Sequence, residues 1–488
     1  MMGRVNSNGG SKKVVINYEN VQIELPYEVL NIEKLHLIAQ VNEHHTLSLE
    51  ALINEENAEE YLEESLESKD VRLTINGKVI YVGKIIKLEI HYKGQVAKLK
   101  LNSISYSYDL DIKKHKQAFY NLQSTYEDVV AKVLSKYSNT DFKDNITYRS
   151  YIKDLLVQYE ETDFEFIKRL ASYFETVIVV DATSNRSRFN FGIEIIDSQV
   201  ELEKDFKESN IKFDDFTKIL SVSKDNLIEQ NFIGWKVEGK EYISLGNQLA
   251  YEGQKVIVSK VEMKQKKGEF IYVYELKFLN GIKKIHQLNS KLKGVSLEGI
   301  VKNRRNNEIQ VHFSINDEYE DVEGNKWFSY GREVSNFYCM PLIGDKVHIT
   351  FLSSDEKDTI VTNVVRNGDS SSLVPSNKSY STENGQELLI APEMLQISAD
   401  EGKSIQISLN NNGSVSITGD SINLKSSSNV EIGNNISSNS NKNVSKPDSI
   451  NISAKNKVTI TRASKGINTA QSIQLAEENH LRGIIKMS

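Results

Sequence analysis

Residues 159–170 of this 488-residue chain read YEETDFEFIKRL, and two positions inside this stretch predict where a helix begins. Thr162 precedes Glu165 by three positions, the spacing of a capping box, in which the two side chains satisfy backbone N–H groups that the first helical turn leaves unpartnered. We therefore predict an amphipathic helix from this point. A second capping box, Ser124-Thr125-Tyr126-Glu127, predicts another helix upstream.

Before these helices the sequence has the alternating pattern of short β-strands. The runs Val21–Leu25 and Val71–Ile75 alternate apolar and polar residues, and Asn76-Gly77 is a strong hairpin signal. The region from Val14 to Leu110 is thus predicted to form an antiparallel barrel or sandwich. One acidic helix around Glu56–Glu67 interrupts it.

After the helices the β pattern returns and continues to a second block. Strands are predicted at Val177–Val180, at Phe189–Ile196 and from Ile219 to Phe278, where Asn280-Gly281 ends the run. A Lys-rich bridge over residues 282–294 leads to an all-β block, Leu297–Gly368, whose length suits a small five-stranded barrel. The Ser/Asn-rich residues 369–383 form a linker.

From Asn384 the sequence is rich in Ser, Asn and Gly, yet β-branched residues recur in alternating pairs, which predicts an array of strands and turns such as a β-helix. Each strand offers few apolar side chains, so one copy buries too little surface to offset its backbone entropy. We predict three copies wound about a common axis; a disordered polar tail would not need the alternation. The pairs are Ile405/Ile407, Val415/Ile417, Ile422/Leu424, Val430/Ile432, Ile450/Ile452 and Val458/Ile460.

Composition excludes several classes of protein. The net charge of -7 comes from interspersed Lys and Glu, so no strong positive field predicts nucleic-acid binding. The single cysteine, Cys339, allows no intrachain disulfide and no multi-thiolate metal site. The polar residues 1–13 do not have the apolar core of a signal peptide, and no apolar run reaches the length of a membrane span. We expect assembly in the cytoplasm and leaderless export.

Three stretches together resemble the VgrG family, the spike proteins of type VI secretion, and related phage tail hubs. YEETDFEFIKRL at 159–170 is similar to the signature of the family's hub domain, and residues 115–130 are similar to the segment before its first helix. Residues 341–351 and 359–368 are similar to the end of its OB-fold barrel. The loop Asp355–Asp358, where the family often has a proline, and a single Val-x-x-Gly-like element at Val430–Gly433 depart from the pattern.

The resemblance implies a mainly β homotrimer with a few helices. Its hub, residues 1–290, would carry two tube-like β-barrels per chain, so that three chains present six barrels to a six-fold tail tube. An OB-fold barrel (295–368) and a linker (369–383) would lead to a triple-stranded β-helical needle (384–462) and a tip segment (463–488). The expected partners are the tail tube protein, baseplate proteins, a PAAR-like tip protein or effector, and the target envelope.

The candidate chemical groups favour structural roles, and we predict no catalytic, cofactor-binding or metal site. Glu160, Glu161, Asp163 and Glu165 could suggest a glycosidase pair, but acids at a helix start stabilise the helix. His44 and His45 are adjacent and so would lie on opposite faces of a strand, and the remaining histidines have no metal-ligand spacing to one another or to Cys339. On a three-fold axis His480 could bring three copies together at a tip metal, although no second histidine is near it.

Two further motifs carry little weight. Gly402-Lys403-Ser404 fails as a phosphate-binding loop because the required glycine is Ile397. The aromatic residues Trp327, Phe328 and Tyr330 lie in an acidic block without a basic stripe, which argues against single-stranded nucleic acid.

The sequence thus predicts a structural, non-enzymatic spike and hub. The alternatives are a tail-associated cell-wall hydrolase that uses the acidic cluster, and a receptor-binding tail protein.

Overall fold

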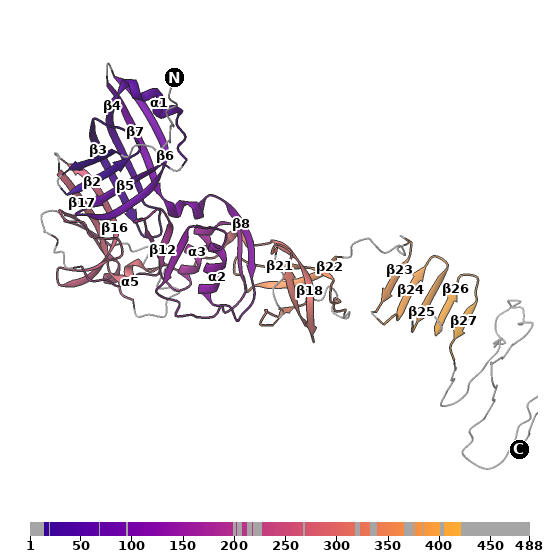
Figure 1. The fold of residues 1–488 in the computed structure, drawn as a ribbon. Helices are drawn as coiled ribbons and strands as arrows, with labels where there is room; N and C mark the ends of the chain where they lie inside the picture. Colours follow the sequence, from indigo (N-terminus) through magenta and orange to yellow (C-terminus); the bar gives the residue numbers. More distant parts are fainter. Residues whose placement is uncertain are drawn as a thin grey trace, which may run out of the picture. The chain divides into compact units, whose positions relative to one another are not determined.

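The structure is a computed structural model that describes residues 14–18, 20–67, 69–93, 96–198, 202, 207–211, 217, 227–266, 269–317, 323–331, 339–365, 374, 376–382, 384–400 and 405–420. The chain divides into two compact units, residues 1–371 and residues 372–488, and each is described by itself (Figure 1). The predicted fold class, mainly β with a few helices, is confirmed. The five finer domain limits stay predictions.

The largest element of the first unit is a sheet of twelve strands that joins two distant parts of the chain. Strand β3 pairs antiparallel with β16, so that Gln40 faces Lys260 and His36 faces Lys264. The order is β1-β2-β5-β6-β7-β4-β3-β16-β17-β14-β13, with β15 paired to β16. The strands are β1 Val14–Tyr18, β2 Val21–Leu25, β3 Asn31–Gln40, β4 Thr46–Asn54, β5 Asp70–Ile75, β6 Lys78–Lys93, β7 Val96–Ser105, β13 Lys207–Ile211, β14 Ile233–Gly239, β15 Gln248–Tyr251, β16 Gln254–Lys266 and β17 Glu269–Lys277.

The alternating pattern is what builds this sheet. Along β4 the side chains of Leu47, Leu49, Ala51 and Ile53 are buried and the residues between them are not, because successive strand residues point to opposite faces. The predicted hairpin at Asn76-Gly77 is confirmed between β5 and β6, where both residues have positive φ, 50° and 75°. Such a turn suits Asn-Gly because glycine adopts positive φ without steric cost.

The helices of the first unit are short. The acidic helix begins as the 3-10 turn η1 Glu55–Asn57, continues as α1 Ala58–Glu63 and ends earlier than the predicted Glu67. The helix predicted from Thr162 is α3 Asp163–Ser172, with its capping box as predicted. The other helices are α2 Tyr126–Leu134, α5 Leu279–Ile282 and the 3-10 turns η2 Tyr106–Asp111, η3 Glu229–Phe232 and η4 Ser290–Leu292.

Two details of these helices differ from the prediction. The upstream capping box uses Thr125 and Asp128, one residue later than the predicted Ser124 and Glu127. The Thr125 hydroxyl accepts from the Asp128 N–H at 3.1 Å, and the Asp128 carboxylate accepts from the Thr125 N–H at 2.8 Å. The dipeptide Asn280-Gly281 lies inside α5, which directly follows β17.

Two small sheets contact these helices: β10 (Leu156–Thr162) of one contacts α3, and β9 (Thr140–Asp144) of the other contacts α2. Strand β8 (Lys114–Phe119) pairs antiparallel with β10, which runs directly into α3. Strand β12 (Ser187–Phe191) pairs with β11 (Ile178–Asp181) and, in parallel, with β9. Helices α2 and α3 lie side by side (Figure 1), and the ring of Tyr126 meets that of Tyr173 edge-on.

The predicted five-stranded barrel is present as a nearly closed sheet in the order β20-β19-β18-β21-β22. A parallel bridge between Tyr330 and Val361 brings its two ends together. Its interior holds Val301, Val311, Phe313 and Ile349. The strands are β18 Ser296–Arg305, β19 Glu308–Phe313, β20 Phe328–Ser329, β21 Lys346–Phe351 and β22 Thr359–Val365.

The described part of the second unit is an antiparallel meander in which each strand pairs with the next. The strands are β23 Lys378–Ser381, β24 Glu387–Ala391, β25 Met394–Ser398, β26 Gln406–Asn410 and β27 Val415–Thr418. The predicted pair Val415/Ile417 lies in β27, and Ile407 lies in β26, which begins one residue after its partner Ile405. The four later pairs of β-branched residues lie outside the described residues. So do the tip segment, His480 and Gly402-Lys403-Ser404.

Candidate functional site: a buried ionic joint

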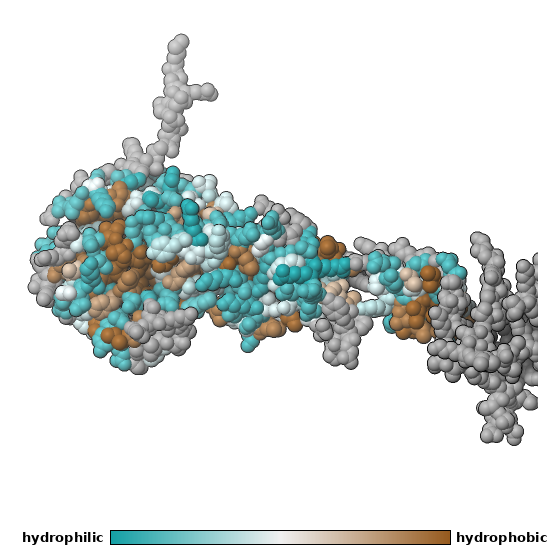
Figure 2. Space-filling view, turned by 90° about the horizontal axis from the view of Figure 1, so that it is seen from below, coloured by the Kyte–Doolittle hydropathy of each residue, from teal (hydrophilic) through white to brown (hydrophobic). Residues whose placement is uncertain are grey.

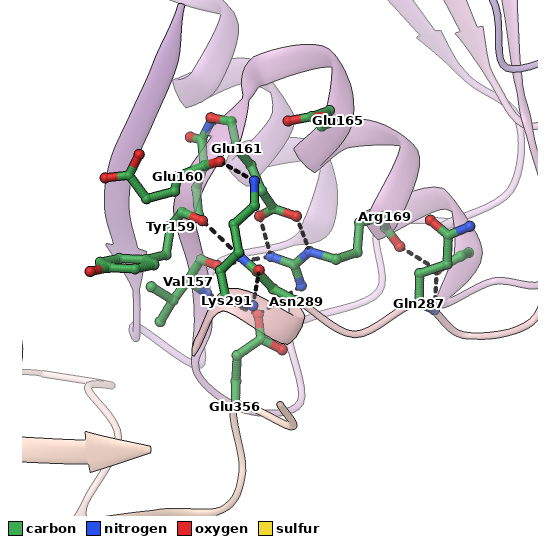
Figure 3. A network of polar contacts seen from close by, with 12 residues as sticks. Val157, Tyr159, Glu160, Glu161, Glu165, Arg169, Gln287, Asn289, Lys291 and Glu356 are labelled. Carbon is green, nitrogen blue, oxygen red and sulfur yellow. Dashed lines mark hydrogen bonds and ion pairs between the residues drawn. The ribbon is translucent and has the colours of Figure 1, made fainter. Parts of the chain in front are cut away.

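The stretch that begins the helix α3 contains a bulge that separates its acidic side chains. Between Tyr159 and Glu161 the register of β10 on β8 shifts, and Glu160 has a positive φ of 52°. The bulge turns Glu161 into the protein and leaves Glu160 outside, as Figure 3 shows. Two residues near η4 hold it: Lys291 Nζ donates to the Glu160 carbonyl at 2.6 Å and Asn289 donates to the Tyr159 carbonyl at 2.8 Å.

Each of the four acids predicted to be structural has its own partner. Glu160 pairs with Lys116 at 2.8 Å, and this hydrogen bond holds the pKa of Glu160 below its usual value. The buried Asp163 accepts from Tyr137 at 2.6 Å, Gln158 at 2.8 Å and Lys136 at 3.1 Å.

The remaining two acids serve α3 itself. Glu165 accepts from the Thr162 N–H at 2.9 Å as the second half of the capping box. Glu161 binds Arg169 with both carboxylate oxygens, at 2.8 and 2.9 Å. The cluster is therefore built as four separate structural contacts.

Arg169 is the centre of the site. Its side chain is only 3% exposed, and all of its five N–H donors are used. Figure 3 shows Arg169 between Glu161 and Glu356. Nε and Nη2 bind Glu161, Nη2 also donates to the Val157 carbonyl at 2.8 Å, and Nη1 donates to Tyr173 at 2.6 Å and to Glu356 at 2.8 Å. Burial alone would lower the pKa of Arg169, but Glu356, Tyr173 and Glu161 reverse this effect and raise it.

Glu356 brings the five-stranded barrel into this site. It lies in the loop between β21 and β22 and is 3% exposed. One oxygen accepts from Arg169 and from the Val157 N–H at 3.2 Å, and the other accepts from the Tyr173 hydroxyl at 2.9 Å. We call Glu161, Arg169, Tyr173 and Glu356 the joint, because they tie α3 to the barrel.

Burial sets the protonation behaviour of the joint. Burial raises the pKa of Glu161, and the ion pair with Arg169 opposes that rise. Burial likewise raises the pKa of Tyr173, so its hydroxyl stays a donor to Glu356. The His286 ring lies against Tyr173, tilted by 45° with centroids 3.8 Å apart, and burial lowers the pKa of this histidine. Two carboxylates share one guanidinium in a site closed to solvent, which suits cohesion rather than chemistry on a substrate.

The joint is reinforced by apolar and amide contacts. Ala118, Tyr120, Leu155 and Val157 pack into the same core as the interior of the barrel. The Asn316 side chain accepts from the Ala118 N–H at 2.9 Å and donates to the Ala118 carbonyl at 2.8 Å. The β8–β10 sheet and the barrel therefore share a continuous interior.

The other candidate residues have structural surroundings. His44 contacts Ser107 at 2.8 Å and Asp111 at 3.3 Å, and the adjacent His45 is buried with Nε2 unpartnered. Trp327 carries the Arg305 guanidinium 4.1 Å above its ring, Phe328 is buried, and Tyr330 closes the barrel. Cys339 is exposed.

The described ranges contain neither a candidate metal centre nor a candidate membrane-spanning helix. No group of three or more His, Cys, Asp or Glu side chains there could hold a metal ion. No described helix is long and apolar enough to cross a membrane.

Sequence reasoning missed Glu356. Its loop, Asp355–Asp358, attracted notice only because the family often has a proline there. The partner Arg169 lies 187 residues earlier in the chain, and no local pattern connects two such positions. The signal that could have raised the question is an arginine on the apolar face of α3, since a buried guanidinium requires acidic partners.

Comparisons with solved structures identify the fold. The E. coli c3393 protein, a component of the type VI secretion system described as similar to the T4 bacteriophage tail proteins gp27 and gp5, matches 72% of this chain and 100% of its own at 13% identity, with a TM-score of 0.50. A chain of the Francisella PdpA–VgrG complex matches 79% of this chain and 83% of its own at 9% identity, also with a TM-score of 0.50. No family model matches, and neither does any curated protein sequence.

Proposed function

We propose that this chain, which has the fold of VgrG-like spike and hub proteins, is the trimeric structural spike and hub of a contractile injection system. It would adapt a six-fold tail tube to a three-fold needle that punctures the target envelope and carries a tip protein or effector. It would assemble in the cytoplasm with tube and baseplate proteins and be ejected with the particle. One observation carries the proposal: an apolar sheet face in the second unit that a single chain leaves exposed.

This apolar face runs across four neighbouring strands in register. Leu388 lies opposite Ile397, Ile397 opposite Ile407, and Ile407 opposite Ile417. A second row beside it joins the other apolar residues of the same strands. All eight are between 37% and 63% exposed, and Figure 2 shows brown, apolar side chains gathered on this unit. The face consists of Leu388, Ile390, Leu395, Ile397, Ile407, Leu409, Val415 and Ile417.

The burial on this sheet is inverted relative to a monomeric protein. Gln396, Ser398 and Ser408, which alternate with the apolar residues, are buried, whereas the apolar residues face solvent. Covering a half-exposed Leu or Ile side chain contributes about 1 kcal/mol, so eight of them form a strong driving force for association. Contiguous exposed apolar patches of this kind mark interaction sites.

A trimer would bury the apolar face that a single chain leaves exposed. Apolar faces turned toward a common axis exclude water, and the outer strands β23 and β27 of each sheet become available to pair with those of its neighbours. The twelve-stranded sheet of the first unit supports the adaptor role. It consists of two sets of strands, β1–β7 and β13–β17, so three chains would present six sets to the tube. In such a spike the joint would hold α3 to the barrel under mechanical load.

The absence of an enzymatic role is part of the proposal. Glu160, Glu161, Asp163 and Glu165 each hold a structural partner, which disfavours the hydrolase alternative. The purified chain should release no soluble fragments from cell-wall material. A lytic activity that Glu160→Gln abolishes would establish the hydrolase instead. The receptor-binding alternative has no comparable observation in its favour.

The mass of the full chain in solution tests the trimer directly. Light scattering should give three times the mass of one chain. Ile397→Asp places a charge in the apolar face. This variant should raise the protein concentration at which the trimer dissociates by at least about a hundredfold. Ile343→Asp is the matched control, because Ile343 is 62% exposed on the first unit and outside the face. A monomeric wild-type chain, or a trimer indifferent to Ile397→Asp, would refute the proposal.

A further inference from the structure

A loop of the first unit presents three large side chains to solvent. It follows β9 and spans residues 145–151. Tyr148 is 86% exposed and Tyr151 is 62% exposed. The Arg149 side chain is 86% exposed, and its Nε lies 3.9 Å from Glu127 Oε2, an exposed pair of the kind that contributes little energy. Two tyrosines and an arginine are the residue types that dominate binding energy at protein interfaces. We call these three residues the Tyr-Arg knob.

The knob stands on a rigid base. Asp144 accepts from the backbone N–H groups of Ile146 and Thr147, both at 3.0 Å. On the far side the Ser150 carbonyl accepts from the Tyr126 N–H at 3.0 Å, and the Ile152 N–H donates to the Ser124 carbonyl at 2.9 Å. Because the loop is anchored at both ends, its exposed side chains lose little backbone freedom on binding.

The backbone of the knob is unusual for its sequence. Tyr148 and Arg149 have φ values of 49° and 57°, so two consecutive residues with large side chains adopt the left-handed conformation. The other such pairs among the described residues end in glycine: Asn76-Gly77 (50° and 75°) and Glu252-Gly253 (49° and 75°). Only glycine adopts this conformation without steric cost. A Tyr-Arg pair at this turn costs stability, which indicates that the side chains serve a contact outside the fold.

We infer that the Tyr-Arg knob docks onto the acidic segment 55–67, which begins with the acidic helix η1–α1, of a second copy of this chain, an inference that rests on the proposed trimer. That segment contains seven glutamates and no basic residue. Glutamates four apart, such as Glu55 and Glu59 or Glu59 and Glu63, repel each other on a helix, and an incoming guanidinium relieves this repulsion. Leu62 is 52% exposed on α1 and offers the aromatic rings an apolar contact.

The two surfaces also fit a closed ring. The knob and the acidic segment are different patches of the same chain, so each copy donates one and receives with the other. A contact of this head-to-tail type closes into a ring when the rotation between successive copies closes, which the three-fold axis of the proposed trimer would supply, whereas a self-complementary patch gives a dimer. Three such contacts would add to the apolar face and would join the first units as well as the second.

Photo-crosslinking tests the contact in the full-length chain. A benzoylphenylalanine replaces Tyr148, and the matched control places it at Tyr92, which is 52% exposed on β6. The expected result is a crosslink from position 148 to the peptide that contains residues 55–67 of another copy, with none from position 92. A trimeric mass without a crosslink from 148, or with one that maps elsewhere, overturns this inference alone. A monomeric mass overturns the proposed function.

A pair of variants separates binding from folding. Tyr148→Asn with Arg149→Gly copies the Asn76-Gly77 turn, so thermal stability of the first unit should be retained or raised. The trimer should nevertheless dissociate at about tenfold higher protein concentration. Arg149→Glu should weaken the trimer similarly, and adding Glu59→Arg and Glu63→Arg should restore it. Unchanged dissociation in the Asn-Gly variant, or no restoration by the charge exchange, overturns the inference.

Discussion

The two units of this chain place polar and apolar side chains in opposite ways. In the first, the charged residues Glu161, Arg169 and Glu356 are buried, while in the second, apolar residues such as Ile397 and Ile407 are exposed. The buried charges are complete within one chain, because every Arg169 donor has an acceptor there. The exposed apolar face has no such cover within the described part of its own chain, and in the proposed trimer the other chains would supply it. A buried charge is thus stable where the same chain supplies its hydrogen-bond partners. An exposed apolar patch, in contrast, favours association with another chain.

The largest expected effect comes from a change in the buried ionic cluster of the first unit. Arg169→Met leaves Glu161 and Glu356 buried without their guanidinium and should lower the free energy of unfolding of the first unit by about 3–5 kcal/mol. Urea denaturation followed by circular dichroism measures the loss. Arg188→Met, at a side chain 39% exposed, is the control and should cost less than about 1 kcal/mol.

The triple variant Arg169→Met, Glu161→Met and Glu356→Met sharpens that experiment. Removing the whole ionic cluster leaves no unpaired buried charge, so most of the lost stability should return. A single variant no less stable than its Arg188→Met control would contradict the account of the joint.

The second prediction uses pH. Burial lowers the pKa of His45 from 6.5 to about 4. Between these values the unfolded chain binds a proton that the folded chain does not, so the first unit loses stability as the pH falls from about 6.5 to about 4. The loss should approach about 3 kcal/mol and be absent above pH 7. Residues 372–479 contain no histidine, so the apolar association should not follow this titration.

Thermal denaturation at a series of pH values checks it. His45→Gln should reduce the dependence between pH 4 and 6.5 by the part that this imidazole contributes, while other histidines such as His286, whose pKa is also lowered, keep theirs. His91→Gln, at an exposed position on β6, should leave the dependence in place. A His45→Gln curve that parallels the wild type would show that this imidazole is not the source.

Local signals were predictable from the sequence and distant ones were not. The Thr162–Glu165 box and the Asn76-Gly77 turn depend on residues a few positions apart, and both are confirmed. At α2 the sequence offers two boxes in adjacent frames, Ser124 with Glu127 and Thr125 with Asp128, and only the position of the chain entering the helix selects the second. The Glu356–Arg169 contact spans 187 residues, so it depends on how barrel and helix meet in space.

The third prediction concerns the amide clamp at the joint. Asn316→Ala removes both partners of the buried Ala118 backbone and should cost about 2 kcal/mol in the free energy of unfolding of the first unit. Asn303→Ala, at an exposed position on β18, is the control and should change stability by less than about 0.5 kcal/mol. Equal effects of the two substitutions would mean that the joint depends on its ionic and apolar contacts alone.

The smallest effect sets the scale for the others. Thr125→Ala removes the hydroxyl that accepts from the Asp128 N–H and should cost about 1 kcal/mol, whereas Ser124→Ala should be nearly neutral because the cap belongs to the next residue. Chemical denaturation of the two variants side by side measures the difference. A larger loss at Ser124 would restore the frame predicted from sequence. Because a single cap is worth so much less than Arg169, this pair also tests whether the joint exceeds an ordinary hydrogen bond.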